Sequence, residues 1–129
     1  MITAVHALLY SEDPDATRAF FREVLGWPFL ESDPGWPIYR SGPSELAVHP
    51  NSSTNDGQTT TLPLHHDVSL MCDDLETTIS ELKSKGAEFS GEVSDQGWGL
   101  TIALRLPGAG EMTLFQPKYE PPHSMLPKT

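Results

Sequence analysis

Aromatic side chains recur at matching places along the chain. Trp36 and Trp98 each follow a glycine, in Gly35-Trp36-Pro37-Ile38 and Gly97-Trp98-Gly99-Leu100. Rings placed where a strand begins often rim a pocket and stack on flat ligands. These residues therefore point to the binding of a small, largely aromatic molecule. The alternative is that both rings simply cover the ends of the core.

The two tryptophans belong to an internal repeat. Residues 45–50 are echoed by residues 111–117, and residues 6–13 by residues 67–74. A unit of roughly 55 residues has therefore been duplicated. Two copies of one unit usually enclose something between them, so residues at equivalent positions are expected to face a shared cleft.

The first unit is predicted to fold in the order β-α-β-β-β. A strand over residues 2–10 precedes a helix that Asp13 caps, with Pro14 at the first helical position and Gly26 just past the end. Three short strands are expected at residues 27–30, 36–40 and 45–49.

The second unit is predicted to repeat this plan. A strand over residues 64–72 leads to a helix that Asp74 caps and Gly86 closes. Three strands are expected at residues 88–93, 100–106 and 111–116, the last two joined by a turn at residues 107–110.

The chain is expected to form a single domain of 129 residues. Its modules span about residues 1–50 and 62–117. The polar stretch 51–61 is rich in Ser, Thr and Asn without periodicity, which is typical of a linker. The proline-containing tail 118–129 is predicted to be a loose extension.

Strand parity predicts which side chains face the cleft, because successive side chains in a strand point to opposite faces. The leucines and Ile102 of residues 100–106 are expected to pack on the helices, as are Leu46 and Val48. The predicted ligand-binding residues are His6, Tyr10, Trp36, Tyr39, His49, Asp67, Ser69, Met71, Trp98, Arg105, Thr113 and Phe115. Arg105 is expected either to pair with Glu111 or to meet an anionic group of the ligand.

Several features together resemble the vicinal oxygen chelate superfamily, which includes glyoxalase I, bleomycin-resistance proteins and extradiol dioxygenases. They are the duplicated unit, the histidine ahead of the capping aspartate, and the helix end Ala19-Phe20-Phe21-Arg22-Glu23-Val24-Leu25-Gly26. The likeness covers residues 2–117. It implies an α+β fold in which two βαβββ modules form a curved eight-stranded mixed sheet around a cleft, with helices on the outer face. It also implies a homodimer.

The resemblance also implies where a metal would bind. Enzymes of the family hold a divalent metal with side chains from the first and last strand of each unit. The equivalent positions here are His6, Ala47, Asp67 and Thr113. Ala47 has no donor atom, and the hydroxyl of Thr113 is a poor ligand for Zn or Fe. The resemblance therefore favours a protein without a cofactor, of the bleomycin-resistance type, that sequesters a largely aromatic ligand such as an antibiotic.

A metal-dependent enzyme remains the alternative. If the first strand of the second unit slipped by one residue, His66 would point inward in place of Asp67. His6, His66 or Asp67, and Glu111 would then supply a set of ligands for Fe, Zn, Mn or Ni. Such a protein would be a lyase or an extradiol-type dioxygenase that uses the metal as a Lewis acid.

Composition excludes several classes of partner. The formal net charge of −10 argues against nucleic acid and against an anionic membrane surface. The single cysteine, Cys72, fits a reducing compartment, and no apolar run is long enough to span a membrane. We therefore expect a cytoplasmic protein whose partners are a small molecule and a second copy of itself.

Overall fold

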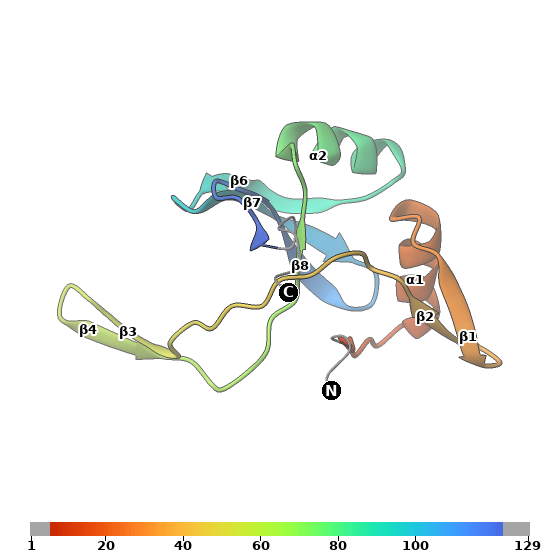
Figure 1. Ribbon diagram of the computed structural model, residues 1–129, viewed down its shortest axis with the longest axis horizontal. Coiled ribbons are helices and arrows are strands. Elements are labelled where there is room, and N and C mark those ends of the chain that lie inside the picture. The colour runs from red at the N-terminus through yellow and green to blue at the C-terminus, as the bar shows by residue number, and fades with distance from the viewer. Residues whose placement is uncertain (1–5, 123–129) are drawn as a thin grey trace, which may run out of the picture.

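The computed structural model describes residues 6–122, so residues 2–5 of the expected first strand and 123–129 of the expected tail lie outside the described residues. Figure 1 shows the arrangement. The elements are α1 (Pro14–Ala19), the π-helix η1 (Phe20–Val24), β1 (Phe29–Asp33), β2 (Trp36–Tyr39), β3 (Ser52–Asn55), β4 (Gln58–Thr61), β5 (Ser69–Met71), α2 (Leu75–Ser84), β6 (Phe89–Asp95), β7 (Gly99–Leu106) and β8 (Gly110–Pro117).

The second unit folds as the sequence predicts. Its four strands form one sheet in the order β5-β8-β7-β6, with β5 parallel to β8 and the other pairs antiparallel. The β7–β8 ladder runs without a break from the pair Gly99 and Pro117 to the pair Leu106 and Gly110. The first strand of this unit is shorter than the expected residues 64–72, since only Ser69–Met71 pair. Helix α2 covers one side of the sheet (Figure 1).

The core lies on the face of this sheet that strand parity assigns to the helices. Leu104, Leu114 and Leu75 of α2 are 0%, 2% and 1% exposed. Phe20 and Phe21 from the first unit belong to the same buried cluster. Burying a leucine or phenylalanine side chain contributes about 1.5–3 kcal/mol, so this shared cluster holds both helices against one sheet.

Both predicted helix starts are confirmed. Asp13 accepts a hydrogen bond from the Ala16 N–H at 3.2 Å, and Asp74 accepts one from the Thr77 N–H at 3.1 Å. These carboxylates satisfy N–H groups that have no partner inside the first turn. In the first helix, α1 passes directly into η1, whose wider turn is closed by the Leu25 N–H donating to the Phe20 carbonyl at 3.1 Å.

The first unit departs from the prediction at its first and last strands. Neither residues 6–10 nor residues 45–49 form a strand. The expectation that Leu46 and Val48 face the helices is wrong, because they are 87% and 96% exposed. A strand persists only where a neighbour pairs with its backbone, and in the parallel arrangement of the second unit these two segments would be each other's partners.

The expected linker is also wrong, because residues 52–61 form a hairpin. Strands β3 and β4 pair antiparallel in an unbroken register from Ser52 and Thr61 to Asn55 and Gln58. Asp56 and Gly57 have φ angles of 52° and 76°. Positive φ at both central residues is the hairpin turn that an Asp-Gly pair favours, so this signal was present in the sequence. The hairpin projects away from the rest of the molecule (Figure 1).

The strands of residues 6–122 therefore do not form the single curved sheet that we expected. They form two separate two-stranded sheets, β1–β2 and β3–β4, beside the four-stranded sheet. The α+β class holds, since helices cover a sheet in a mixed structure. Within the described part of the chain, no helix has the length and apolar character needed to cross a membrane.

The two units meet where α1 begins. The Glu12 N–H donates to the Gly108 carbonyl at 2.9 Å, and the Ser11 hydroxyl donates to the same carbonyl at 2.9 Å. The buried Thr17 hydroxyl donates to the Pro107 carbonyl. The start of the first helix is thus hydrogen-bonded to the turn between β7 and β8.

Candidate functional site

The face of the four-stranded sheet opposite the helices is the candidate site, and we call it the open face. Register places Ser69 beside Thr113 and Met71 beside Phe115, with β7 on the far side of β8. The open face consists of Ser69, Met71, Thr101, Ala103, Thr113 and Phe115. Four of these six were predicted from the sequence, and the structure brings them together because β5 pairs with β8.

An aromatic platform stands at one end of the open face. The Trp98 and Phe115 rings meet edge to face, with centroids 5.2 Å apart and planes at 83°. Phe115 is buried, whereas Trp98 is 50% exposed. Gly99 permits the close approach of β7 and β8 here, since a Cβ atom on it would lie 2.8 Å from the Gln116 carbonyl oxygen. The indole is thus supported by a buried ring and still accessible to a ligand.

A shallow hollow lies where β5 and β8 end. It is lined by Met71, Cys72, Asp73, Pro117, Tyr119 and Pro121. Cys72 also packs against the core, as parity predicts, and burial raises the pKa of its thiol. A thiol that is neutral at physiological pH is a weak nucleophile, so Cys72 serves as a wall of the hollow.

The start of the expected loose tail is fixed in place, which corrects the sequence prediction. The Lys118 N–H donates to the Trp98 carbonyl at 2.8 Å, and the Lys118 ammonium donates to Asp95 at 2.7 Å. The Tyr119 hydroxyl donates to the Glu45 carboxylate. Burial, with a smaller effect from Glu45, raises the pKa of Tyr119 to about 12.

Sequence analysis missed Tyr119 and Glu45 as neighbours of the site. The signal available was a single aromatic residue just after the last strand. Only the path of the chain shows that Glu45 of the first unit comes beside it. Their hydrogen bond holds the segment at Glu45 near the end of β8.

The predicted binding residues of the first unit lie elsewhere. Tyr39 packs on Phe21 with ring centroids 5.4 Å apart, and its hydroxyl donates to the Arg18 carbonyl at 2.9 Å. The Arg18 guanidinium lies over the Trp36 ring, 5.1 Å from its centroid. The structure therefore gives Tyr39 and Trp36 neighbours from α1.

The remaining predicted residues of the first unit are exposed. His6 lies at the start of the described chain, and Tyr10 is 88% exposed. The His49 ring makes a local hydrogen bond of 2.6 Å to the Pro50 carbonyl. These three side chains are not gathered into an enclosed site.

Arg105 does not pair with Glu111, although the two residues are opposite each other in the β7–β8 register. Its guanidinium lies 3.8 Å from Glu88 instead, and both side chains are more than half exposed. Such an exposed pair contributes roughly 0–1 kcal/mol. Arg105 is therefore positioned by a surface ion pair at the edge of the open face.

The structure does not bring the residues expected as metal ligands together within residues 6–122. Asp67 forms an exposed pair with His65 at 3.3 Å. The pKa of His65 is raised, mainly by the hydrogen bond between its ring and the Pro63 carbonyl and to a smaller extent by Asp67. Across residues 6–122, no group of three or more His, Cys, Asp or Glu side chains is placed to hold a metal ion. Thr113, at the last-strand position, offers only a hydroxyl.

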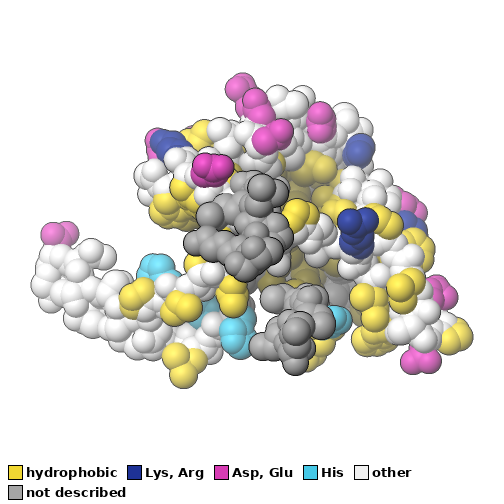
Figure 2. Space-filling view, in the orientation of Figure 1, with side chains coloured by type: hydrophobic (Ala, Val, Ile, Leu, Met, Phe, Trp, Pro, Cys, Tyr) yellow, Lys and Arg dark blue, Asp and Glu magenta, His cyan; other side chains and the backbone are white. Residues whose placement is uncertain are grey.

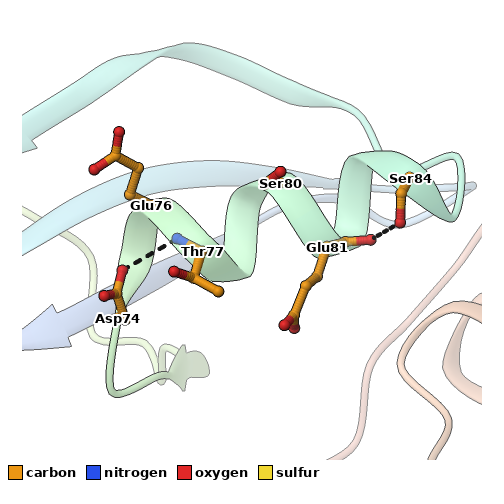
Figure 3. Close-up of a pocket in the computed structure, with 6 residues that line it drawn as sticks. All are labelled: Asp74, Glu76, Thr77, Ser80, Glu81 and Ser84. Atoms are coloured by element: carbon orange, nitrogen blue, oxygen red, sulfur yellow. Dashed lines mark hydrogen bonds between the residues drawn. The ribbon is translucent and has the colours of Figure 1, made fainter.

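The outer face of α2 carries another shallow hollow, lined by the six residues labelled in Figure 3: Asp74, Glu76, Thr77, Ser80, Glu81 and Ser84. Asp74 caps the helix, and the Ser84 hydroxyl donates to the Glu81 carbonyl at 2.6 Å. These polar groups serve the helix itself. The open face is the better candidate for ligand binding.

Solved structures share the fold over nearly the whole chain. A lactoylglutathione lyase from Agrobacterium tumefaciens is 15% identical with a TM-score of 0.58, covering 89% of this chain and 94% of its own. A glyoxalase/bleomycin resistance protein/dioxygenase from Nocardioides is 18% identical with a TM-score of 0.57, covering 93% and 91%. An antibiotic-binding protein from Streptomyces is 17% identical with a TM-score of 0.54, covering 92% and 100%.

No curated protein matches the sequence significantly. At these low identities the structural neighbours establish the fold and leave the activity open. The family model of the Glyoxalase/Bleomycin resistance protein/Dioxygenase superfamily, however, matches residues 3–114, which include most of both units and five of the six residues of the open face. The chain belongs to that superfamily.

Proposed function

We propose that this protein binds and sequesters a small, largely aromatic molecule, such as an antibiotic, without a metal. The observation that carries the proposal is the half-exposed Trp98 ring packed on the buried Phe115 ring at the end of β8. In the same strand, Thr113 stands where the enzymes of the family have a metal ligand. The Streptomyces neighbour is described as an antibiotic-binding protein, which is consistent with this use of the fold.

The chemistry of the open face suits such a ligand. Trp98 offers an indole for stacking, and Met71 offers a flexible, polarisable side chain that adapts to different ring shapes. Ser69 and Thr113 add hydroxyls that can orient polar substituents. The six residues of the open face carry no formal charge, so a neutral aromatic ring approaches them without displacing tightly hydrated ions.

Binding of polycyclic aromatic antibiotics to the purified protein, measured by calorimetry, tests the proposal. We expect Trp98→Ala to weaken binding by at least about tenfold, which corresponds to about 1.4 kcal/mol. Trp98→Phe keeps a ring on Phe115 and should retain most of the affinity. Binding that is unchanged in Trp98→Ala, or no binding by any compound of the panel, would overturn the proposal.

Trp36 is the equivalent tryptophan of the first unit and tests how far the binding site extends. It is also half exposed, at 52%, but lies under Arg18 and away from Phe115. Loss of affinity in Trp36→Ala as well as in Trp98→Ala would support a cleft shared by both units. Loss in Trp98→Ala alone would confine the ligand to the open face.

The metal-dependent lyase or dioxygenase is the second candidate. It would need His6, His66 or Asp67, and Glu111 to gather around one ion. Metal analysis of the purified protein separates the two candidates. Stoichiometric Fe, Zn, Mn or Ni that disappears in His6→Ala would favour the enzyme.

The homodimer and the cytoplasmic location also remain proposals. The lone cysteine supports a reducing compartment. The dimer is supported by the family's common architecture and by the incomplete sheet of the first unit.

A further inference from the structure

The hairpin and its flanking residues form an exposed arm, which we define as residues 46–64. All residues from 51 to 62 are exposed. Leu46, Val48, Leu62 and Leu64, at the base of the arm, are 87%, 96%, 49% and 88% exposed. A lone two-stranded hairpin is at best marginally stable in water, and three or more strands are needed for independent stability. The arm is therefore an element that a further strand would stabilise.

The free backbone groups of the arm can be identified. The Leu62 N–H donates to the Asn51 carbonyl at 2.8 Å, so that pair is hydrogen-bonded. Bonded and non-bonded pairs alternate along an antiparallel ladder. The pair Thr54 and Thr59, three residues along, is therefore non-bonded across the hairpin. The N–H and carbonyl groups of Thr54 and Thr59 point to the two outer edges.

The outer edges of β3 and β4 lack the features that usually prevent an edge strand from pairing with another chain. Edge strand β6 has a register shift between Ser90 and Ser94, a positive φ of 70° at Gly91, and acidic Glu92 and Asp95. Bulges, charges and prolines of this kind prevent edge pairing. The arm has an unbroken register and no proline from 51 to 62, and its single charged residue, Asp56, lies in the turn.

The charge pattern indicates what pairs with the arm. The chain as a whole carries a formal charge of −10, so two copies repel each other over most of their surfaces. Apart from Asp56 the arm contains no Asp, Glu, Lys or Arg. Figure 2 shows it as a largely uncharged projection with hydrophobic side chains at its base. Two copies can therefore approach here with little repulsion.

We propose that the arms of two copies pair edge to edge across a two-fold axis, forming an intermolecular four-stranded sheet. Two-fold symmetry lets one surface serve as both halves of the contact. Pairing would satisfy the outward backbone groups at Thr54 or Thr59 and bring the apolar bases of the two arms together. This inference rests on the proposed homodimer and names its contact surface, and it does not depend on the ligand of the open face.

Proline at the outward positions tests the proposal in the full chain. Thr54→Pro/Thr59→Pro removes one outward N–H from each edge and leaves the hydrogen-bonded pairs of the hairpin in place. The matched control, Thr54→Val/Thr59→Val, loses the same hydroxyl contact of 2.8 Å but keeps both N–H groups. Sedimentation equilibrium should give a dimer for the wild type and the valine variant, and a monomer for the proline variant.

Near-ultraviolet circular dichroism shows whether the core survives in each variant, since the arm contributes nothing to the buried cluster. Replacing residues 52–61 by Asn-Gly, which joins Asn51 to its neighbour Leu62, should also give a folded monomer. A monomeric wild type would overturn the proposal, as would a dimer that persists in the proline and shortened variants. Wild-type chains that remain monomeric but pair with an unrelated extended peptide would overturn it in favour of a different partner.

Discussion

The two units share one predicted plan and differ in how much of it a single chain completes. The second unit forms a four-stranded sheet with α2 on one face. The first unit forms its helix and the β1–β2 hairpin, while residues 6–10 and 45–49 remain unpaired as strands. A repeated sequence pattern therefore sets local structure more surely than it sets pairing.

Prolines explain part of this difference. Pro37 lies inside β2, and Pro43 and Pro50 lie on either side of the expected last strand of the first unit. In the second unit, Pro107 and Pro117 occupy a turn and a strand end. Proline lacks the N–H that a ladder needs, so the first unit has fewer places where strands can pair.

The largest expected effect on stability distinguishes a buried leucine of the second unit from an exposed valine of the first. Leu104→Ala, at a side chain that is 0% exposed, should lower the free energy of unfolding by about 2–5 kcal/mol. Val48→Ala, at 96% exposure, should change it by less than about 0.5 kcal/mol. Urea denaturation measures both. A large loss in Val48→Ala would mean that the segment packs in solution and that the units are more alike than they appear.

The contact between the units is the next target. Gly108 has a φ of +78°, and a Cβ atom there would lie 2.7 Å from Asp13 Cβ. Gly110 has a φ of +72° with nothing within 4 Å. Alanine at either position incurs the left-handed strain of about 1–2 kcal/mol. Gly108→Ala should cost more than Gly110→Ala because it also separates α1 from the β7–β8 turn. Equal losses in thermal unfolding would argue against that contact.

The next prediction compares Thr17 and Thr78, which occupy equivalent positions in the first turn of the two helices. The hydroxyls of Thr17 and Thr78 lie 3.3 Å and 2.7 Å from the carbonyl of their capping aspartate, but only Thr17 is buried, and its hydroxyl hydrogen points mainly to the nearer Pro107 carbonyl at 2.5 Å. Thr17→Val leaves buried partners without a hydrogen bond and should cost about 1–3 kcal/mol. Thr78→Val should cost less, since water can replace its hydroxyl. Chemical denaturation of the pair provides the measurement, and a greater loss in Thr78→Val would contradict the comparison.

The smallest effect concerns the contact between Tyr119 and Glu45. Tyr119 has a pKa of about 12, above its usual value of 10.0, so its neutral form favours folding. The stabilisation of the folded state by the neutral Tyr119 hydroxyl is therefore fully present below pH 10 and is lost as the pH rises toward about 12. Glu45→Gln should lower the pKa of Tyr119 only partly, because burial is the larger cause. Absorbance titration, with Tyr119→Phe to assign the transition, checks this, and an unchanged pKa would place Glu45 away from Tyr119 in solution.

The sequence alone determined the local features and the family. Asp13 and Asp74 cap helices because each carboxylate lies three residues before a free N–H, and the leucines of β7 alternate because a strand does. Strand parity also grouped Ser69, Met71, Thr113 and Phe115 on one face. The Asp-Gly pair at residues 56–57 is typical of a hairpin turn, but the polar composition of residues 51–61 led to the prediction of a linker instead.

Only the tertiary structure decided which strands have partners. The pairing of β5 with β8 gathers the open face, whereas no local pattern distinguishes the buried Leu114 from the exposed Val48 at an equivalent position. The sequence also does not show that Arg105 forms its ion pair with Glu88 or that the Tyr119 hydroxyl donates to Glu45. Capping and alternation depend on neighbours along the chain, but pairing depends on the entropy of closing long loops and on competition between distant segments.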